Sequence, residues 1–159
     1  MIERLKALFG GETSGSRPPQ RHSDRDIRLA TAALLVEAAM MDGDIGNAEL
    51  DVIRGLLTDY FDLGDDEVAD LIADGTAAAT DSSQLYGFTR ILKDRFSHQE
   101  RVQMIEMLWE VAYTDDRLHH LETNLIRRIA GLIYVPDRES GEARQRAKAK
   151  RRGKHAGAD

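Results

Sequence analysis

An internal repeat is the feature that most narrows what this 159-residue chain can fold into. Residues 34–57 (LLVEAAMMDGDIGNAELDVIRGLL) and residues 107–130 (MLWEVAYTDDRLHHLETNLIRRIA) align without a gap at an offset of 73 residues. Seven of these 24 positions are identical. Each copy has the pattern of two helices joined by a short acidic turn. Two hairpins with the same turn chemistry predict a pseudo-symmetric helical bundle.

Helical periodicity and capping signals extend the repeat to about six helices. The expected helices begin near residues 24, 47, 65, 82, 97 and 120, and the last ends at Pro136. Ser23 is a plausible N-cap, and Ser97 with Glu100 forms a capping box. Aromatic residues make up only 6% of the chain, which favours helices over a sheet. The sequence therefore predicts an all-α fold, a single bundle of about six helices built from two pseudo-repeated helical hairpins.

Composition and charge divide the chain into four parts. Residues 1–10 place their apolar side chains on one helical face, and residues 11–23 read as a flexible linker rich in Gly, Ser, Pro and Arg. Residues 24–137, the expected helical domain, carry 10 Lys/Arg and 23 Asp/Glu, a net charge of −13. Residues 138–159 carry 8 Lys/Arg and 3 Asp/Glu, and we expect this basic C-terminal tail to be a frayed helix or disordered.

Several classes of function are disfavoured by what the sequence lacks. The chain has no Cys, which excludes disulfides and thiolate chemistry and fits a reducing cytosol. No nucleophile motif, Gly-rich phosphate loop, His-x3-His pair or Glu-x2-His pair occurs. No apolar run is long enough to span a membrane, and we expect no secretory signal. We therefore expect a non-enzymatic cytoplasmic protein, and the acidic body disfavours nucleic acid as a partner.

Each repeat gathers acidic residues where its two helices connect. The candidate metal ligands are Asp42, Asp44 and Glu49 in the first repeat and Asp115, Asp116 and Glu122 in the second. Clusters of oxygen ligands suit hard cations such as calcium or magnesium. The spacing is not that of an EF-hand, because Ile53 stands where the bidentate Glu would be needed.

A second interpretation of these acids needs no metal. Glu49 and Glu122 lie three residues after Gly46 and His119, where a Glu side chain can bond back to the backbone N–H of the cap residue. Asp residues are also ordinary turn formers. On the sequence alone, capping and cation binding both stay open.

Glu37 and Glu110 also recur in the repeat, about one helical turn before the acidic turns. In one interpretation they are solvated or pair with Arg54 and Arg127, which recur with them. In the other, their carboxylates face a site shared between the hairpins.

The doubled pattern resembles a known family. Residues 39–49 (AMMDGDIGNAE) and residues 112–122 (AYTDDRLHHLE) resemble TerB-like proteins, which are bacterial helical domains associated with tellurite resistance and general stress. Residues 108–113 and 132–136 look like the stand-alone branch, and the resemblance covers about residues 24–146. It implies metal binding through the acids of both turns and action with membrane-associated protein partners. Arg117 stands where the first turn has Asp44, so we expect the second site to be weaker or absent.

Two functions follow as expectations. The first is a non-enzymatic binding module that holds a divalent cation at its acidic turns and binds protein partners through exposed faces. The second is a peripheral membrane adaptor at the inner membrane, tethered by Met1–Phe9 and the basic tail, in which the acids are purely structural.

Overall fold

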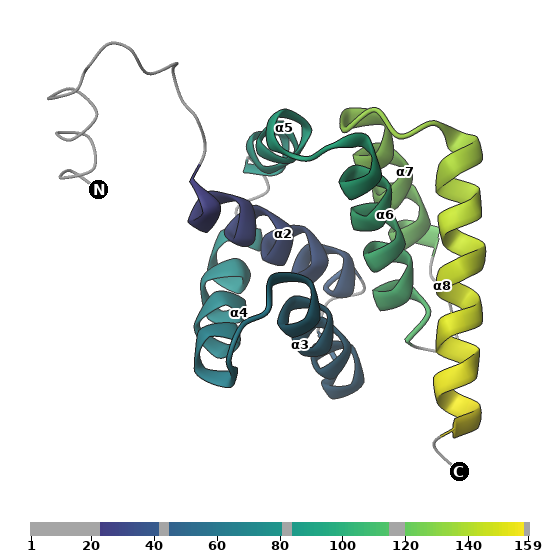
Figure 1. The fold of residues 1–159 in the computed structure, drawn as a ribbon, viewed down its shortest axis with the longest axis horizontal. Coiled ribbons are helices and arrows are strands. Elements are labelled where there is room, and N and C mark those ends of the chain that lie inside the picture. Colours follow the sequence, from purple (N-terminus) through teal and green to yellow (C-terminus); the bar gives the residue numbers. More distant parts are fainter. Residues whose placement is uncertain (1–22, 42–44, 81–83, 115–119, 158–159) are drawn as a thin grey trace, which may run out of the picture.

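The computed structural model describes residues 23–41, 45–80, 84–114 and 120–157, with only the backbone given for residues 120–121 and 152–157. The described part is helical and contains no strand. Its helices are α2 (Asp24–Ala39), α3 (Asn47–Phe61), α4 (Asp65–Ala79), α5 (Leu85–Arg95), α6 (His98–Ala112), α7 (His120–Leu132) and α8 (Asp137–Gly157) (Figure 1). The all-α prediction is confirmed, and the six expected helices correspond to α2 through α7.

The structural repeat contains three helices rather than the two that the sequence indicates. A shift of 73 residues carries Asn47, the start of α3, onto His120, the start of α7. The same shift carries Asp65, the start of α4, onto Arg138, one residue after α8 begins. In each repeat the first helix packs along the third, α2 on α4 and α6 on α8. Figure 1 shows the two sets of three helices lying on opposite sides of the bundle.

Helices α2 and α6 form the centre of the bundle and pack against each other. Every residue from Ala30 to Val36 in α2 and from Met104 to Ala112 in α6 is buried. Burial on all sides is typical of central helices, which therefore show little amphipathic periodicity. Small side chains let neighbouring helices approach α2 closely. At Gly75 of α4, an added Cβ would lie 3.0 Å from the Cβ of Ala32 and 3.1 Å from its backbone carbonyl carbon.

The helix starts follow the predicted capping chemistry. The Ser23 hydroxyl accepts the Asp26 N–H at 3.1 Å, and the Ser97 hydroxyl accepts the Glu100 N–H at 3.2 Å. In return, Oε1 of Glu100 accepts the Ser97 N–H at 2.8 Å. The capping box predicted at Ser97 is therefore confirmed.

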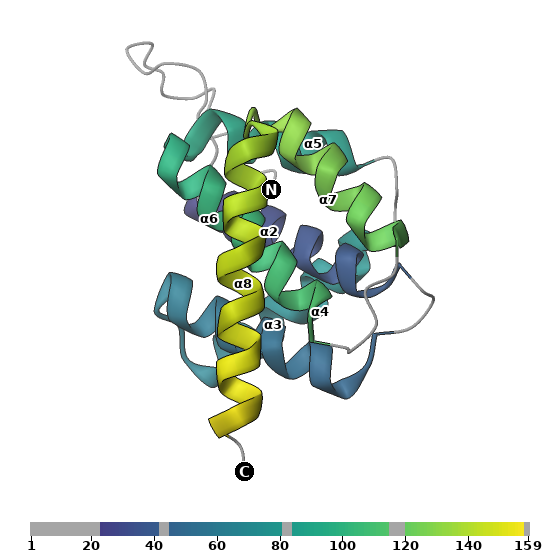
Figure 2. The same ribbon diagram turned by 90° about the vertical axis from the view of Figure 1, so that its right-hand side faces the viewer.

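The C-terminal tail differs from the sequence expectation of a frayed helix or disorder. Asp137–Gly157 is one continuous helix, α8, that runs along α6 (Figure 2). Helix α7 ends at Leu132, four residues before Pro136, and the carbonyl of Pro136 accepts the Ser140 N–H at 2.9 Å, so Pro136 begins α8. Ala143 and Ala147 are fully buried, and basic side chains on α8 pair with carboxylates on α6. These contacts order a segment whose composition alone looks solvated.

No helix in the described part of the chain combines the length and the apolar character needed to cross a bilayer.

Candidate functional site

The predicted acidic sets are described only through their glutamates. Asp42, Asp44, Asp115 and Asp116 lie outside the described residues. Glu49 and Glu122 occupy the first turns of α3 and α7 and are 9% and 3% exposed. Within the described ranges, no three His, Asp or Glu side chains group as metal ligands would. Both repeats therefore bury a carboxylate directly after the acidic turn.

Glu49 has the capping role that the second interpretation assigned to it. Its Oε1 accepts the Gly46 N–H at 2.9 Å, and Gly46 is the N-cap of α3 with extended backbone. The capping interpretation is confirmed at this position. A carboxylate offers about four lone-pair sites, so one cap hydrogen bond does not by itself prevent the group from binding a cation.

Glu110, in contrast, faces α8. Its Oε1 lies 3.3 Å from Nη2 of Arg151, and its Oε2 lies 3.5 Å from Nζ of Lys150. The expected partner Arg127 is exposed on α7. In the first repeat, Arg54 pairs with Asp51 at 2.7 Å rather than with Glu37. The pairing of Glu37 and Glu110 with the recurring arginines was therefore wrong, because α8 supplies the cations for Glu110.

Glu37 lies in a different environment from its counterpart Glu110. It is half-buried on α2. Burial raises the pKa of the Glu37 carboxyl, and the nearby charge of Arg128 only partly offsets this. Glu110 thus pairs with α8, whereas the charge that acts on Glu37 is that of Arg128 on α7. These contacts do not bring the two carboxylates together in one site.

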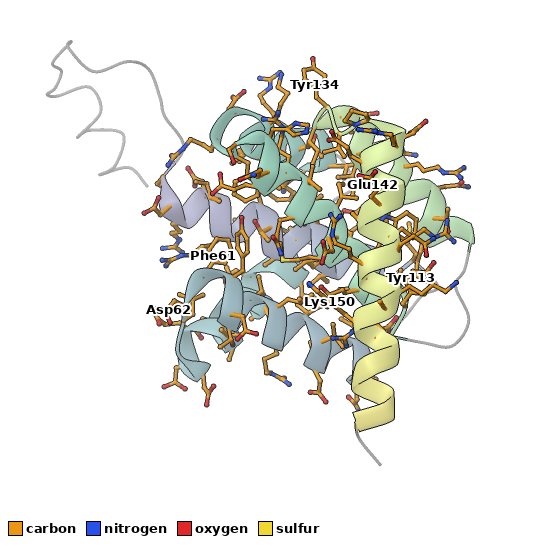
Figure 3. All side chains as sticks on the ribbon, turned by 45° about the vertical axis from the view of Figure 1, so that its right-hand side comes forward. Phe61, Asp62, Tyr113, Tyr134, Glu142 and Lys150 are labelled. Carbon is orange, nitrogen blue, oxygen red and sulfur yellow. The ribbon has the colours of Figure 1, made fainter. Side chains whose placement is uncertain are left out.

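A buried charge network between α6 and α8 was not predicted from the sequence, and Glu106 is its centre. The Glu106 side chain is 6% exposed. Its Oε1 lies 2.6 Å from Nε of Arg146, and its Oε2 lies 2.5 Å from Nζ of Lys150. In Figure 3, Lys150 lies on the side of α8 that faces α6. The only sequence signal is spacing, since Glu106 and Glu110 on α6 and Arg146 and Lys150 on α8 are each four residues apart.

The electrostatics of Glu106 are set by two opposing effects. Burial alone would raise the pKa of Glu106, but hydrogen bonds from Lys150 and Arg146, together with their charges, outweigh burial and lower it. The hydrogen bond to Glu106 raises the pKa of Lys150 in turn. The charged forms of both groups are therefore favoured in the folded protein.

A cation–aromatic stack extends this network toward the start of α8. The Arg144 guanidinium lies 4.7 Å from the centre of the Trp109 ring and 5.8 Å from that of Tyr113. Nε of Arg144 also donates to the Tyr113 hydroxyl at 2.6 Å. Such stacking contributes about 0.5–2 kcal/mol per contact. The basic residues of α8 are thus used to hold the helix against α6.

The two glutamates with shifted pKa values should give opposite pH dependence. A lowered folded pKa at Glu106 stabilises the protein above the ordinary pKa, and this stabilisation is lost as the pH falls through the lowered value. A raised folded pKa at Glu37 favours the fold at low pH, and this advantage is lost as the pH rises through the raised value. Urea unfolding between about pH 3 and pH 7 measures both effects, the Glu106 effect below the ordinary Glu pKa and the Glu37 effect above it. With rising pH, wild type should gain stability relative to Glu106→Gln and lose stability relative to Glu37→Gln.

Comparison with known proteins identifies a family that matches most of the chain. Residues 28–145 match the sequence profile of the family described as Tellurite resistance protein TerB. The matched region runs from α2 into the first part of α8 and includes both acidic turns. No curated protein and no solved structure matches the chain.

Proposed function

This chain belongs to the TerB family, and from that premise we propose that it is a non-enzymatic binding module that holds a divalent cation at its acidic turns. Its role would be in tellurite or stress resistance, through protein partners that bind its exposed faces. Calcium and magnesium are the cations that best suit a set of carboxylate ligands.

The observation that carries the proposal is the paired burial of Glu49 and Glu122. The two residues are equivalent in the repeat, and each is buried in the first turn of the helix that follows an acidic turn. Concentrating carboxylates in a bundle whose residues 24–157 carry a net charge of −7 is electrostatically unfavourable, and a divalent cation relieves that repulsion. Asp42 and Asp44 would complete the first set of oxygen ligands, and Asp115 and Asp116 the second.

The alternative, a membrane adaptor tethered partly by the basic tail, is less well supported. Arg146, Lys150 and Arg151 pair with carboxylates of α6, and Arg144 stacks on Trp109. Cations engaged within the fold are less available to anionic lipid headgroups. The contacts of α8 therefore favour a binding module over a tail-tethered adaptor.

Thermal unfolding in the presence of metal tests the proposal. A ligand that binds only the folded state stabilises it by about 2.7 kcal/mol at a hundredfold excess over Kd. Millimolar calcium or magnesium should therefore raise the melting temperature beyond the effect of matched ionic strength. Replacing both Asp42 and Asp44 by Asn should abolish the increase.

Glu49→Gln separates capping from metal binding at the first turn. Gln can still accept the Gly46 N–H, whereas it is a poorer cation ligand than Glu. The proposal expects this variant to keep its metal-free stability and to lose part of its metal response. A full metal response in the Gln variant would make Glu49 a cap and not a ligand.

A further inference from the structure

An aromatic pocket lies at the N-terminal edge of the described bundle. It has a volume of about 580 Å³ and is formed by the start of α2, the end of α3, the end of α5 and the start of α6. Its apolar lining consists of Ile27, Tyr60, Phe61 and Phe96. The Tyr60 ring meets Phe61 edge-on at 5.0 Å and Phe96 at 6.1 Å between ring centres. Two of the chain's four Phe residues thus line this one pocket.

Charged groups of both signs surround the aromatic lining. Arg28 lies over the Phe61 ring at 5.8 Å, and Nη2 of Arg95 lies 3.7 Å from Oδ1 of Asp24. Burial, with a smaller effect from the charge of Glu100, raises the pKa of Tyr60 to about 12. Figure 3 shows Phe61 beside the start of α2. The pocket therefore combines an apolar interior with a polar margin, as expected of a site for an amphipathic segment.

We propose that the occupant of this aromatic pocket is the chain's own N-terminal segment, residues 1–10. The segment has five apolar side chains at the spacing of one helical face, namely Met1, Ile2, Leu5, Leu8 and Phe9. A pocket of this size accommodates a few such side chains, since it falls within the range of about 300–1,000 Å³ that is usual for binding sites. Docking buries an apolar face that would otherwise be exposed to water.

The position of the pocket favours this occupant over a free partner. Asp24 lines the pocket and follows directly after the linker, whose 13 residues, 11–23, separate Gly10 from Asp24. A linker of that length with the Gly- and Ser-rich composition of residues 11–23 is expected to have a root-mean-square reach of roughly 20 Å. The effective concentration of a segment on so short a linker is in the millimolar range, so weak intrinsic affinity is enough for docking.

Charge also favours docking in cis. Residues 1–23 carry four Lys/Arg and two Asp/Glu, a net charge of +2, whereas residues 24–157, which include α8, carry 18 Lys/Arg and 25 Asp/Glu, a net charge of −7. Attraction between a basic arm and an acidic body adds to the apolar contact and weakens as salt rises. While residues 1–10 are docked, their apolar face is not available to membranes or protein partners.

Disulfide trapping in the full-length chain tests this docking, because the natural sequence contains no Cys. Gly10→Cys leaves all five apolar side chains intact, and Gln103→Cys places the second thiol on the pocket lining. Under mild oxidation in dilute solution, the pair should close into an intramolecular disulfide. The control pair replaces Gln103→Cys with Asp59→Cys, since Asp59 is exposed next to Tyr60 and does not line the pocket. Closure should be on the order of tenfold faster at the pocket than at the control.

Substitutions on the apolar face of residues 1–10 distinguish docking in the pocket from random collisions between a tethered segment and the bundle. Leu5→Asp with Phe9→Ala, added to the Gly10–Gln103 cysteine pair, should slow closure to the rate of the Asp59 control. Equal rates with and without these two changes would overturn the proposal, because the tether alone would then explain closure. A product that is an intermolecular dimer would also overturn it, since the occupant would be a second copy.

Discussion

Replacing both Arg146 and Lys150 by Ala is expected to lower the free energy of unfolding by about 3 kcal/mol or more. The double change leaves the Glu106 carboxylate, only 6% exposed, without either of the cations that lie within 2.6 Å of it. Removing the partners of a buried charge is costly because the charge cannot regain water. Urea or thermal unfolding at neutral pH measures the loss.

The matched control for this prediction is Glu106→Gln, which removes the buried negative charge and leaves both cations in place. The Arg146 and Lys150 side chains are 49% and 47% exposed and can be hydrated again, so we expect a smaller loss of about 1 kcal/mol. Combining all three changes should recover much of the stability lost in the double Ala variant. If the double Ala variant loses no more stability than Glu106→Gln, the α6–α8 network behaves as an ordinary surface ion pair.

Gly75→Ala is expected to destabilise the protein by about 2 kcal/mol, although Ala is the better helix former. An added Cβ would meet the backbone of α2, 3.1 Å from the carbonyl carbon of Ala32 and 3.2 Å from the nitrogen of Ala33. Backbone atoms of a packed helix cannot move aside as a flexible side chain can. Helices α2 and α4 would have to separate along their contact.

Gly55→Ala on α3 is the control for backbone entropy. No atom lies within 4 Å of a Cβ added at Gly55, and the residue is exposed in the helix. We expect this change to stabilise the protein by up to about 1 kcal/mol. Two Gly→Ala changes in helices should thus have opposite signs in thermal unfolding. A stabilising Gly75→Ala would show that α2 and α4 do not need close contact.

Sequence reasoning located the helices well because their boundaries depend on local chemistry. Ser23, Ser97 and Pro136 each act over a single helical turn, and the structure places a helix start or end at all three. The equivalence of α4 and α8 as the third helices of the two repeats could not be recognised in the same way. Helix α4 packs on α2 through Val68, Ile72 and Gly75, whereas α8 buries Ser140, Ala143 and Ala147.

The difference between α4 and α8 follows from the helix that each one covers. Ala33 of α2 and Glu106 of α6 are equivalent at the 73-residue offset. Where α2 has the small residues Ala32 and Ala33, α4 approaches closely with Gly75. Where α6 has a carboxylate, α8 supplies Lys150. At the 73-residue offset, none of the residues of α4 is identical to its counterpart in α8, so the third helices left no sequence identity to detect.

The candidate site could be predicted only in part. The cap at Glu49 follows from a spacing of three residues and was predictable. The partners of Glu110 are 40 and 41 residues away on α8, and only the packing of the helices brings them together. The recurrence of Arg54 and Arg127 in the repeat suggested them as partners of Glu37 and Glu110. Two residues that recur together in a repeat need not be in contact, and these are not paired in the fold.

Calorimetric titration of the metal-free chain with calcium, and separately with magnesium, tests the central claim most directly. The account predicts saturable binding that Asp42→Asn with Asp44→Asn removes. Asp115→Asn with Asp116→Asn should reduce binding less, because Arg117 already supplies a positive charge at the second turn. Absence of saturable heat for both cations in the wild-type chain would contradict the account, and the acids would then serve only as turn and cap chemistry.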